Sequence, residues 1–432
     1  MEHDFDFAVA GGGPAGSSAA ISLAQRGYSV VLLERERFPR FHIGESLLSN
    51  ANECFAALGV AEKIAAAAFP EKWGARLLTH DGESGRGVDF AESREVMRPQ
   101  TYQVCRQDFD RILMDRAREV GVVVREGVRV AACDFTADAA VLDVAPSEGG
   151  AGQPLRVRAL VDATGRHGLI ARKFGLRTDE PRLANIAVFS HYAGVPRLAG
   201  NRPDDIRIVA RHDSGWFWLI PISKELMSVG VVLPKNLFSQ WPHESPEQTL
   251  ERAIADTPVI AELMRNARRE WPVRVEKDFS YSASTYAGDR WILAGDAGSF
   301  LDPVFSTGVG IAMESGIEAA AELDRAYKRN DFSARTFAAF SRRQRRRFET
   351  FRRFVIGFYT PEFRDLFFDP RPPKLLFRSV VTILAGKWNA SLWTRFLNHI
   401  FFGLVAIQRR FAFTRSRFRR DRQAGYPTGG IT

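Results

Sequence analysis

Cysteine is scarce in this chain, and long hydrophobic runs are missing. The three cysteines, Cys54, Cys105 and Cys133, are too few and too scattered for a disulfide framework or a CxxC metal site. We therefore expect a reducing compartment and no metal. The longest apolar stretch, residues 399–407, is about half of the roughly 20 residues that a membrane-spanning helix needs. The first ten residues, MEHDFDFAVA, lack the basic and apolar regions of a secretory signal. These absences predict a cytoplasmic protein without a transmembrane helix.

Flexible linkers and low-complexity tracts are also missing, although 432 residues are too many for one ordinary core. The hydrophobic share of 45% and the charged share of 26% exclude disordered and fibrous classes. Charge is unevenly placed: residues 341–432 hold 20 Lys/Arg and 5 Asp/Glu, a net +15, whereas the whole chain carries +9. The basic end is either a solvated helical face or the contact site of an acidic partner.

The N-terminal segment has the pattern of a strand, a glycine-rich turn and a helix. Residues 5–10 become wholly apolar, residues 11–16 read GGGPAG, and a helical pattern then runs to residue 26. Gly11 permits the tight turn, Gly13 lets a pyrophosphate approach the backbone, and Gly16 lets the helix pack close to the strand. The helix start offers free N–H groups to the phosphates.

A second apolar strand is expected over residues 28–33, and it ends at Glu34, 18 residues past Gly16. A carboxylate at this place can accept both ribose hydroxyls of an adenosine. The complete unit predicts a dinucleotide site, and it fits NAD and FAD equally well.

The segment around residue 300 separates FAD from NAD. Residues 291–294 predict a short buried strand that leads into Gly295 and Asp296, and residues 306–310 open a helix. An acid at the end of that strand can hold the ribityl hydroxyls. A glycine-lined helix start can face the flavin pyrimidine and stabilise negative charge on the reduced ring. We therefore predict FAD as the cofactor.

Residues 106–110 and 162–166 resemble conserved patterns of the flavoprotein monooxygenase group, which is built on the glutathione-reductase type of FAD fold. The resemblance implies an α/β protein with a Rossmann-like FAD-binding domain, an intertwined antiparallel-sheet substrate domain and a helical C-terminal extension. We expect residues 1–70, 100–178 and 280–340 to form the FAD-binding domain, residues 71–99 and 179–279 the substrate-binding sheet domain, and residues 341–432 the basic helical region.

Two further segments resemble the flavin-dependent halogenases. Residues 41–48, FHIGESLL, match their GES segment, and residues 216–221, WFWLIP, fit their WxWxIP signature at every fixed position. The resemblance covers most of the chain, and it is closest to the branch that acts on phenols, pyrroles and carrier-protein-bound substrates. Trp216 and Trp218 lie two residues apart, so a strand places both indoles on one face. They either separate the flavin from a substrate pocket or are ordinary core residues.

The resemblance implies a mechanism and its residues. Reduced FAD and oxygen form a flavin hydroperoxide that oxidises halide, and hypohalous acid crosses a tunnel to a lysine in the substrate pocket. We expect Lys72 to be this lysine, and Trp216 and Trp218 to be catalytic with it; the alternative is an exposed loop lysine. Some relatives place the lysine later, where this chain has Arg76, Leu77 and Leu78. Phe305 replaces a glutamate of the tryptophan halogenases, as expected for the other branch.

The backbone N–H groups of Thr307 and Gly308 are expected to bind halide. The residues predicted to bind FAD are Gly11, Gly13, Pro14, Ala15, Gly16, Glu34, Arg35, Glu45, Ser46, Arg106, Asp162, Gly295, Asp296, Thr307, Gly308 and Val309.

The C-terminal third predicts two amphipathic helices, over residues 351–368 and 375–418, that cover the substrate pocket. Its charge permits two partners: an acidic carrier protein, or a membrane surface against residues 387–420. Nucleic acid is not expected, because no reading motif accompanies the charge. The residues predicted to dock the carrier protein are Arg342, Arg343, Arg345, Arg346 and Arg347.

The sequence thus predicts a halogenase of an aromatic or carrier-bound substrate in secondary metabolism, such as antibiotic biosynthesis. A separate flavin reductase is expected, because the chain shows no second nucleotide fold. The alternatives are a flavin-dependent monooxygenase, a geranylgeranyl-reductase-like enzyme acting on a lipid, and a catalytically silent FAD-containing binding partner.

Overall fold

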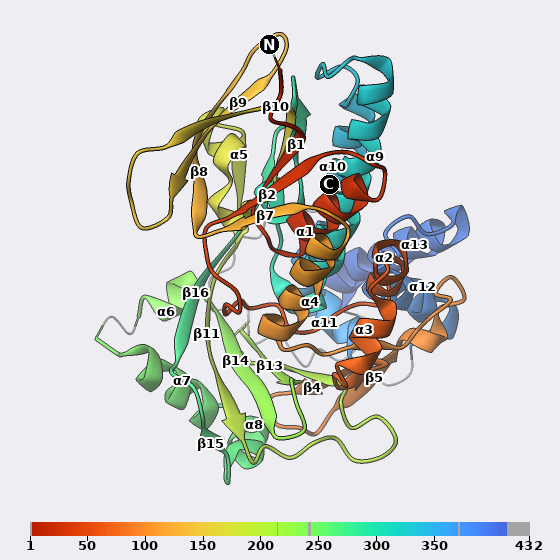
Figure 1. Ribbon diagram of the computed structural model, residues 1–432. Coiled ribbons are helices and arrows are strands. Elements are labelled where there is room, and N and C mark those ends of the chain that lie inside the picture. The colour runs from red at the N-terminus through yellow and green to blue at the C-terminus, as the bar shows by residue number, and fades with distance from the viewer. Residues whose placement is uncertain (1, 214, 241–242, 370–371, 413–432) are drawn as a thin grey trace.

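The computed structural model describes residues 2–412 except 214, 241–242 and 370–371. Two large sheets with helices on their faces make up the molecule (Figure 1). The first sheet has the order β17-β18-β10-β1-β2-β7, and β9 and β8 extend it from β10. Its strands are β1 (Phe5–Ala10), β2 (Val30–Glu34), β7 (Val123–Glu126), β8 (Val128–Phe135), β9 (Ala140–Pro146), β10 (Gln153–Asp162), β17 (Ala287–Gly288) and β18 (Trp291–Leu293).

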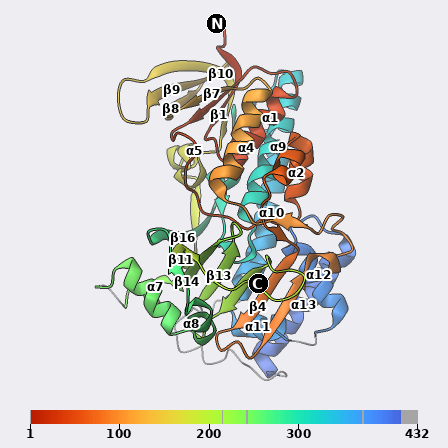
Figure 2. The ribbon, with the colours of Figure 1, turned by 60° about the horizontal axis from the view of Figure 1, so that its bottom comes forward.

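Parallel pairing in the first sheet brings the cofactor motifs to one edge. Strand β1 pairs in parallel with β2 and β10, and β10 pairs in parallel with β18. The carboxyl ends of these strands therefore meet where the glycine turn, Glu34 and Gly295 follow. Helices α1 (Pro14–Ala24), α4 (Arg106–Glu119) and α9 (Gly308–Arg329) pack together on one face (Figure 2). Because both faces are covered, β1 and β2 are apolar almost throughout.

The second sheet has the order β19-β16-β11-β14-β13-β12-β4-β5, with β15 beside β11. Its neighbours pair antiparallel except β12 with β4. The strands from residues 74–89 thus join strands from residues 177–300. The bounds are β4 (Gly74–Thr79), β5 (Gly85–Asp89), β11 (Arg177–Ala193), β12 (Ile206–Ala210), β13 (Trp216–Pro221), β14 (Leu226–Pro234), β15 (Arg268–Arg269), β16 (Arg274–Ala283) and β19 (Ser299–Phe300).

Side chains of β13 alternate between the two faces of this sheet. Trp216, Trp218 and Ile220 belong to the core under the C-terminal helices. Phe217 and Leu219 pack on the opposite core, which includes residues of α7 (Pro246–Ala255) and α8 (Pro258–Met264). The prediction that both tryptophans share one face of a strand is therefore confirmed.

Shorter elements connect the sheets. They are α2 (Ala51–Leu58), α3 (Ala61–Ala66), α5 (Leu169–Lys173), α6 (Lys235–Phe238), the pair β3 (Glu71–Lys72) and β6 (Thr101–Tyr102), and the 3₁₀ turns η1 (Phe90–Glu92), η2 (Gly165–His167), η3 (Gly295–Ala297) and η4 (Pro303–Phe305). In the described part of the chain, none of the helices combines the length and the apolarity that a bilayer crossing requires.

The described part of the C-terminal region contains four helices where the sequence predicted two. They are α10 (Ala338–Phe358), α11 (Pro361–Phe367), α12 (Lys374–Leu384) and α13 (Leu392–Phe411). The predicted helix over residues 351–368 is divided, because Pro361 begins a new helix that Thr360 caps. The predicted helix over residues 375–418 is also divided, because Gly386 has a φ of +100° and Ser391 caps a new helix, α13. Residues 413–418 of that prediction lie outside the described residues.

Candidate active site

In the turn between β1 and α1, close backbone contacts require glycine at two positions. Gly11 has a φ of +102°, and a Cβ on it would lie 2.3 Å from the carbonyl oxygen of Ala163. A Cβ on Gly16 would lie 1.8 Å from the carbonyl oxygen of Gly11. At Gly13, by contrast, a Cβ would meet only Arg40 Nη2, at 3.5 Å. The N-terminus of α1 is therefore open to a bound pyrophosphate.

Glu34 closes this turn from the end of β2. Its Oε2 accepts a hydrogen bond of 2.6 Å from the Gly12 N–H, and its Oε1 accepts one of 2.8 Å from the Glu36 N–H. Each oxygen has a second lone pair, so the carboxylate can still accept ribose hydroxyls. Arg35 lies beside it but is exposed and pairs with Glu36.

The Asp296 carboxylate is an acceptor that the described residues leave free. Asp296 follows Gly295, whose φ of +61° turns the chain out of β18. No hydrogen bond reaches the Asp296 carboxylate from the described residues, and only its backbone oxygen accepts one, from the Tyr281 hydroxyl. Burial raises the pKa of this carboxyl to about 6, against the opposing charges of Arg166 and Arg106. An unpaired carboxylate at this point fits the hydroxyls of a ribityl chain.

The GES segment meets the start of α9. A Cβ on Gly44 would lie 3.0 Å from Arg106 Nη1 and 3.8 Å from Val309 Cγ2. Thr307 precedes the first residue of α9, Gly308, where an added Cβ would meet nothing within 4 Å. The predicted halide-binding amides thus stand at an open helix start.

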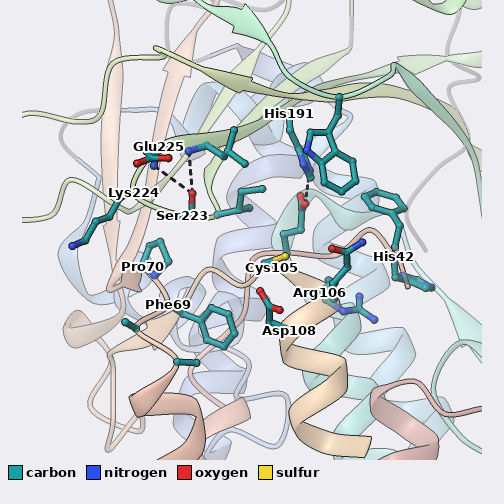
Figure 3. A pocket seen from close by; sticks show the side chains of 18 residues that line it. His42, Phe69, Pro70, Cys105, Arg106, Asp108, His191, Ser223, Lys224 and Glu225 are labelled. Atoms are coloured by element: carbon teal, nitrogen blue, oxygen red, sulfur yellow. Dashed lines mark hydrogen bonds and ion pairs between the residues drawn. The ribbon is translucent and has the colours of Figure 1, made fainter. Parts of the chain in front are cut away.

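A cavity of about 500 Å³ lies beside this junction. His191 of β11 and Arg106 of α4 line it from opposite sides (Figure 3). His191 Nε2 lies 2.8 Å from Glu45 Oε1, whereas the buried atoms Glu45 Oε2 and His191 Nδ1 have no partner in the described part of the chain. Phe41 and Trp271 add aromatic walls. Open glycine amides, a free carboxylate and unpaired buried polar atoms together fit a bound FAD.

The sequence did not indicate Arg40 or His191 as site residues. Arg40 reaches the glycine turn, and its Nη1 lies 3.3 Å from Asp110 Oδ2 but makes no hydrogen bond within the described residues. Its Nη2, the atom nearest Gly13, can therefore face a pyrophosphate while Nη1 pairs with Asp110. Only its position five residues before Glu45 could have suggested this.

Lys72 is fully buried in β3, so it is not the exposed loop lysine of the alternative interpretation. Its Nζ donates hydrogen bonds to Ser46 Oγ at 2.7 Å and to the Leu47 carbonyl at 2.8 Å. The Nζ also lies 5.4 Å from the ring centroid of Phe90. Burial lowers the pKa of this amine to about 7, although Asp205 opposes the shift. Lys72 is not among the residues that line the 500 Å³ cavity.

Trp216, which packs near Trp218, belongs to a buried polar network that the sequence did not predict, whereas Trp218 Nε1 donates to Ser228 Oγ. The ring centroids of the two tryptophans lie 5.9 Å apart. Trp216 Nε1 donates to the Tyr359 hydroxyl at 2.8 Å, and that hydroxyl donates to Asp302 Oδ2 at 2.6 Å. Asn185 Nδ2 donates to the same oxygen at 2.8 Å. The network ties the wall of β13 to the loop before Thr307 and to the end of α10.

Some predicted residues lie apart from the open site. Both carboxylate oxygens of Asp162 accept hydrogen bonds from the Thr164–Ile170 segment, so Asp162 orders the adjacent loop.

The predicted docking cluster is not one surface, because Arg347 is buried and pairs with Glu314 and Glu318. Arg343 likewise pairs with Glu322. The residues of the cluster that are exposed are Arg342, Arg345 and Arg346.

Comparisons with known proteins agree with this geometry. A family model described as an FAD binding domain matches residues 4–347. The chain is 32% identical over 380 residues to a 1H-pyrrole-2-carbonyl-[peptidyl-carrier protein] chlorinase from Pseudomonas fluorescens, covering 83% of this chain and 84% of that relative. It is 36% identical over 339 residues to the corresponding brominase of Pseudoalteromonas luteoviolacea, covering 77% and 80%.

Among solved structures, the flavin-dependent brominase Bmp2 superimposes with a TM-score of 0.82 at 30% identity, covering 94% of this chain and 99% of that one. The flavin-dependent halogenase CmlS gives a TM-score of 0.79 at 28% identity, covering 98% of this chain and 72% of that one. The predictions of an α/β FAD-binding fold, of FAD as the cofactor and of an oxidoreductase are confirmed. The chain belongs to the flavin-dependent halogenases.

Proposed function

We propose that this halogenase modifies an aromatic acyl group, of the pyrrole type, that an acidic carrier protein presents as a thioester. Lys72 positions the halogenating oxidant, and a separate reductase supplies reduced flavin. Residues 1–70, 100–178 and 280–340 bind FAD, and residues 71–99 and 179–279 enclose the substrate with the C-terminal helices. The observation that carries the proposal is the buried position of Lys72 against Ser46 and Phe90.

Bound FAD supplies, after reduction and contact with oxygen, the oxidising power that converts halide into an electrophile. The chain holds FAD through the open turn at Gly13, the Arg40 guanidinium and the free carboxylate of Asp296. The amides of Thr307 and Gly308 attract halide at the start of α9. These groups bind and orient FAD and halide, and the chemistry on substrate takes place beside Lys72.

Lys72 can act in either protonation state near neutral pH, because burial lowers the pKa of its amine to about 7. The ammonium donates a hydrogen bond to an oxidant, and the neutral amine can itself be halogenated. The bonds to Ser46 Oγ and the Leu47 carbonyl fix the position of Nζ. A fixed donor in a dry compartment directs the oxidant better than a mobile surface lysine.

Trp216 and Trp218 favour halogenation over direct oxygen transfer from flavin to substrate. Both indoles are buried in the core that also contains Phe90, on the same face of β13. The two rings fill the space at this wall, so an aromatic substrate cannot occupy that space. A small oxidant can pass where the substrate cannot.

The two carrier-protein halogenases that resemble this chain over at least 77% of its length support the substrate class. The proposal is tested with purified enzyme, FAD, a flavin reductase, NADH, oxygen and either chloride or bromide. Mass spectrometry should show mono- or dihalogenated pyrrolyl-carrier protein and little product from free pyrrole-2-carboxylate. Product from free acids alone would contradict the carrier-bound assignment.

A further inference from the structure

Helix α13 carries a line of apolar side chains that the described residues leave exposed. Large hydrophobic residues are exposed along its whole length, among them Leu392 at 78%, Trp393 at 57% and Phe411 at 68%. With about 100° of rotation per residue, the exposed apolar residues fall within an arc of roughly 100°. We call this arc the α13 stripe, and its members are Leu392, Trp393, Phe396, Ile400, Ile407 and Phe411.

The charged residues within α12 and α13 are all basic, and Glu95 is an acid that bonds to the start of α13. Residues 370–420 contain eleven Lys/Arg and no Asp/Glu. On α13 itself, Arg395, Arg409 and Arg410 are exposed and lie along one edge of the stripe. A second copy of this chain, packed symmetrically on α13, would bring these like charges together. The charge pattern instead fits an acidic occupant.

The composition of α13 favours a protein over a lipid surface. Interfaces between proteins are enriched in aromatic residues and arginine and depleted in lysine. All three basic Lys/Arg side chains of α13 are arginines, and Trp393 and Phe396 stack at its start, with ring centroids 5.6 Å apart. Such side chains are typical of the few contacts that dominate a protein interface.

The stripe also lies over the layer that covers Lys72. Phe90, which packs on Lys72, is followed by Ser93, whose hydroxyl bonds to Thr382 of α12 at 2.8 Å. Glu95 accepts hydrogen bonds from the N–H and the hydroxyl of Ser391, the residue that caps α13. Helix α13 forms the periphery of this layer in both ribbon views (Figures 1 and 2). Residues 90–95 therefore connect the surroundings of Lys72 to the start of α13, where an occupant of α13 would sit.

We infer that the α13 stripe and its arginine edge are the docking surface for an acidic carrier protein. The apolar side chains of the stripe contact apolar residues of the carrier, and Arg395, Arg409 and Arg410 pair with its carboxylates. The inference rests on the proposed function, because it names the surface that receives the carrier-bound substrate.

The test compares kinetic constants for pyrrolyl-carrier protein and for a free phenol probe. We expect Trp393→Ser with Phe396→Ser, and separately Arg409→Glu with Arg410→Glu, to raise KM for the carrier-bound substrate about tenfold or more. The value of kcat and turnover of the free probe should stay within about twofold. Val123→Ser, at an exposed side chain of β7, and Arg268→Glu are the matched controls and should leave every constant unchanged.

Several results would overturn the inference. If the native enzyme uses carrier-bound substrate but both double variants keep its KM, only the docking surface falls. If the native enzyme uses free acids alone, the proposed function falls with it. Sedimentation of the native enzyme with vesicles containing phosphatidylglycerol, lost in these variants while the carrier KM is unchanged, would assign the stripe to a membrane. Ile407→Ser at the other end of α13 provides an independent variant if the first pair does not fold.

Discussion

The Nζ atom of Lys72 donates a hydrogen bond of 2.7 Å to the Oγ atom of Ser46. This contact joins the lysine of β3 to the GES segment, which meets the start of α9 through Gly44. A buried amine can occupy only a position where acceptors lie within reach, because every donor in a dry environment needs an acceptor. The lysine is thereby held in a fixed relation to the segment that borders the flavin site.

Replacing Lys72 by methionine should separate flavin chemistry from halogenation. We expect the halogenated product to fall about a hundredfold or more, in the range of a lost positioned proton donor. The dissociation constant for FAD should change little, and reduced flavin should still consume oxygen and release hydrogen peroxide. Product is measured by mass spectrometry and peroxide by a coupled assay.

Lys63→Met is the control for this substitution. It makes the same chemical change at a half-exposed lysine of α3 that pairs with Glu119, and it should keep full halogenation. Wild-type product from Lys72→Met would show that the family's lysine lies elsewhere in this chain.

The buried amine should also make stability depend on pH. Its pKa is about 7 in the folded chain, against roughly 10.4 for an unperturbed lysine. Between these two pH values the unfolded chain binds more protons than the folded chain, so the free energy of unfolding rises with pH. The cost of burying the ammonium is fully present only below pH 7. Urea unfolding at pH 7, 8.5 and 10 should show wild type gaining stability relative to Lys72→Met. A Lys72→Leu variant should give the same slope, and a flat or falling difference would contradict the assignment.

The cofactor motifs could be predicted from the sequence because their physics is local. Gly11, Gly13 and Gly16 are needed within one turn, and Glu34 ends the strand that follows. The parallel sheet then fixes where Gly295 must arrive. Arg40 was missed because its approach to Gly13 depends on the path of a loop. No periodicity in the sequence encodes that path.

Arg40 provides a test of the phosphate site. We expect Arg40→Met to weaken FAD binding about tenfold or more, because a charge-assisted hydrogen bond to phosphate contributes roughly 1.5–3 kcal/mol. Fluorescence titration of the apoprotein with FAD measures the change, and Arg40→Lys should recover part of it. Arg329→Met, at the exposed end of α9, is the control. An unchanged dissociation constant in folded Arg40→Met would remove Arg40 from the site.

The C-terminal region was predicted less well, because its contacts are long-range. Amphipathic periodicity indicated helices, but the exact breaks depend on the caps Thr360 and Ser391. The run of arginines suggested one docking face, whereas Arg347 is buried against acids of α9. Charge counts along a sequence cannot show which side chains a partner helix neutralises.

The network of Trp216, Tyr359 and Asp302 leads to the last prediction. Tyr359→Phe removes the hydroxyl to which Trp216 Nε1 donates and which itself donates to Asp302. Disturbing buried partners in this way typically costs about 1–3 kcal/mol, so we expect the free energy of unfolding to fall by that amount. The wall of β13 should also loosen, which lowers the ratio of halogenated product to oxygen consumed while FAD binding is kept. Tyr192→Phe, which removes a hydroxyl from a buried tyrosine of β11 that forms no hydrogen bond within the described residues, is the control. Equal coupling ratios in Tyr359→Phe and wild type would show that the wall does not depend on the C-terminal helices.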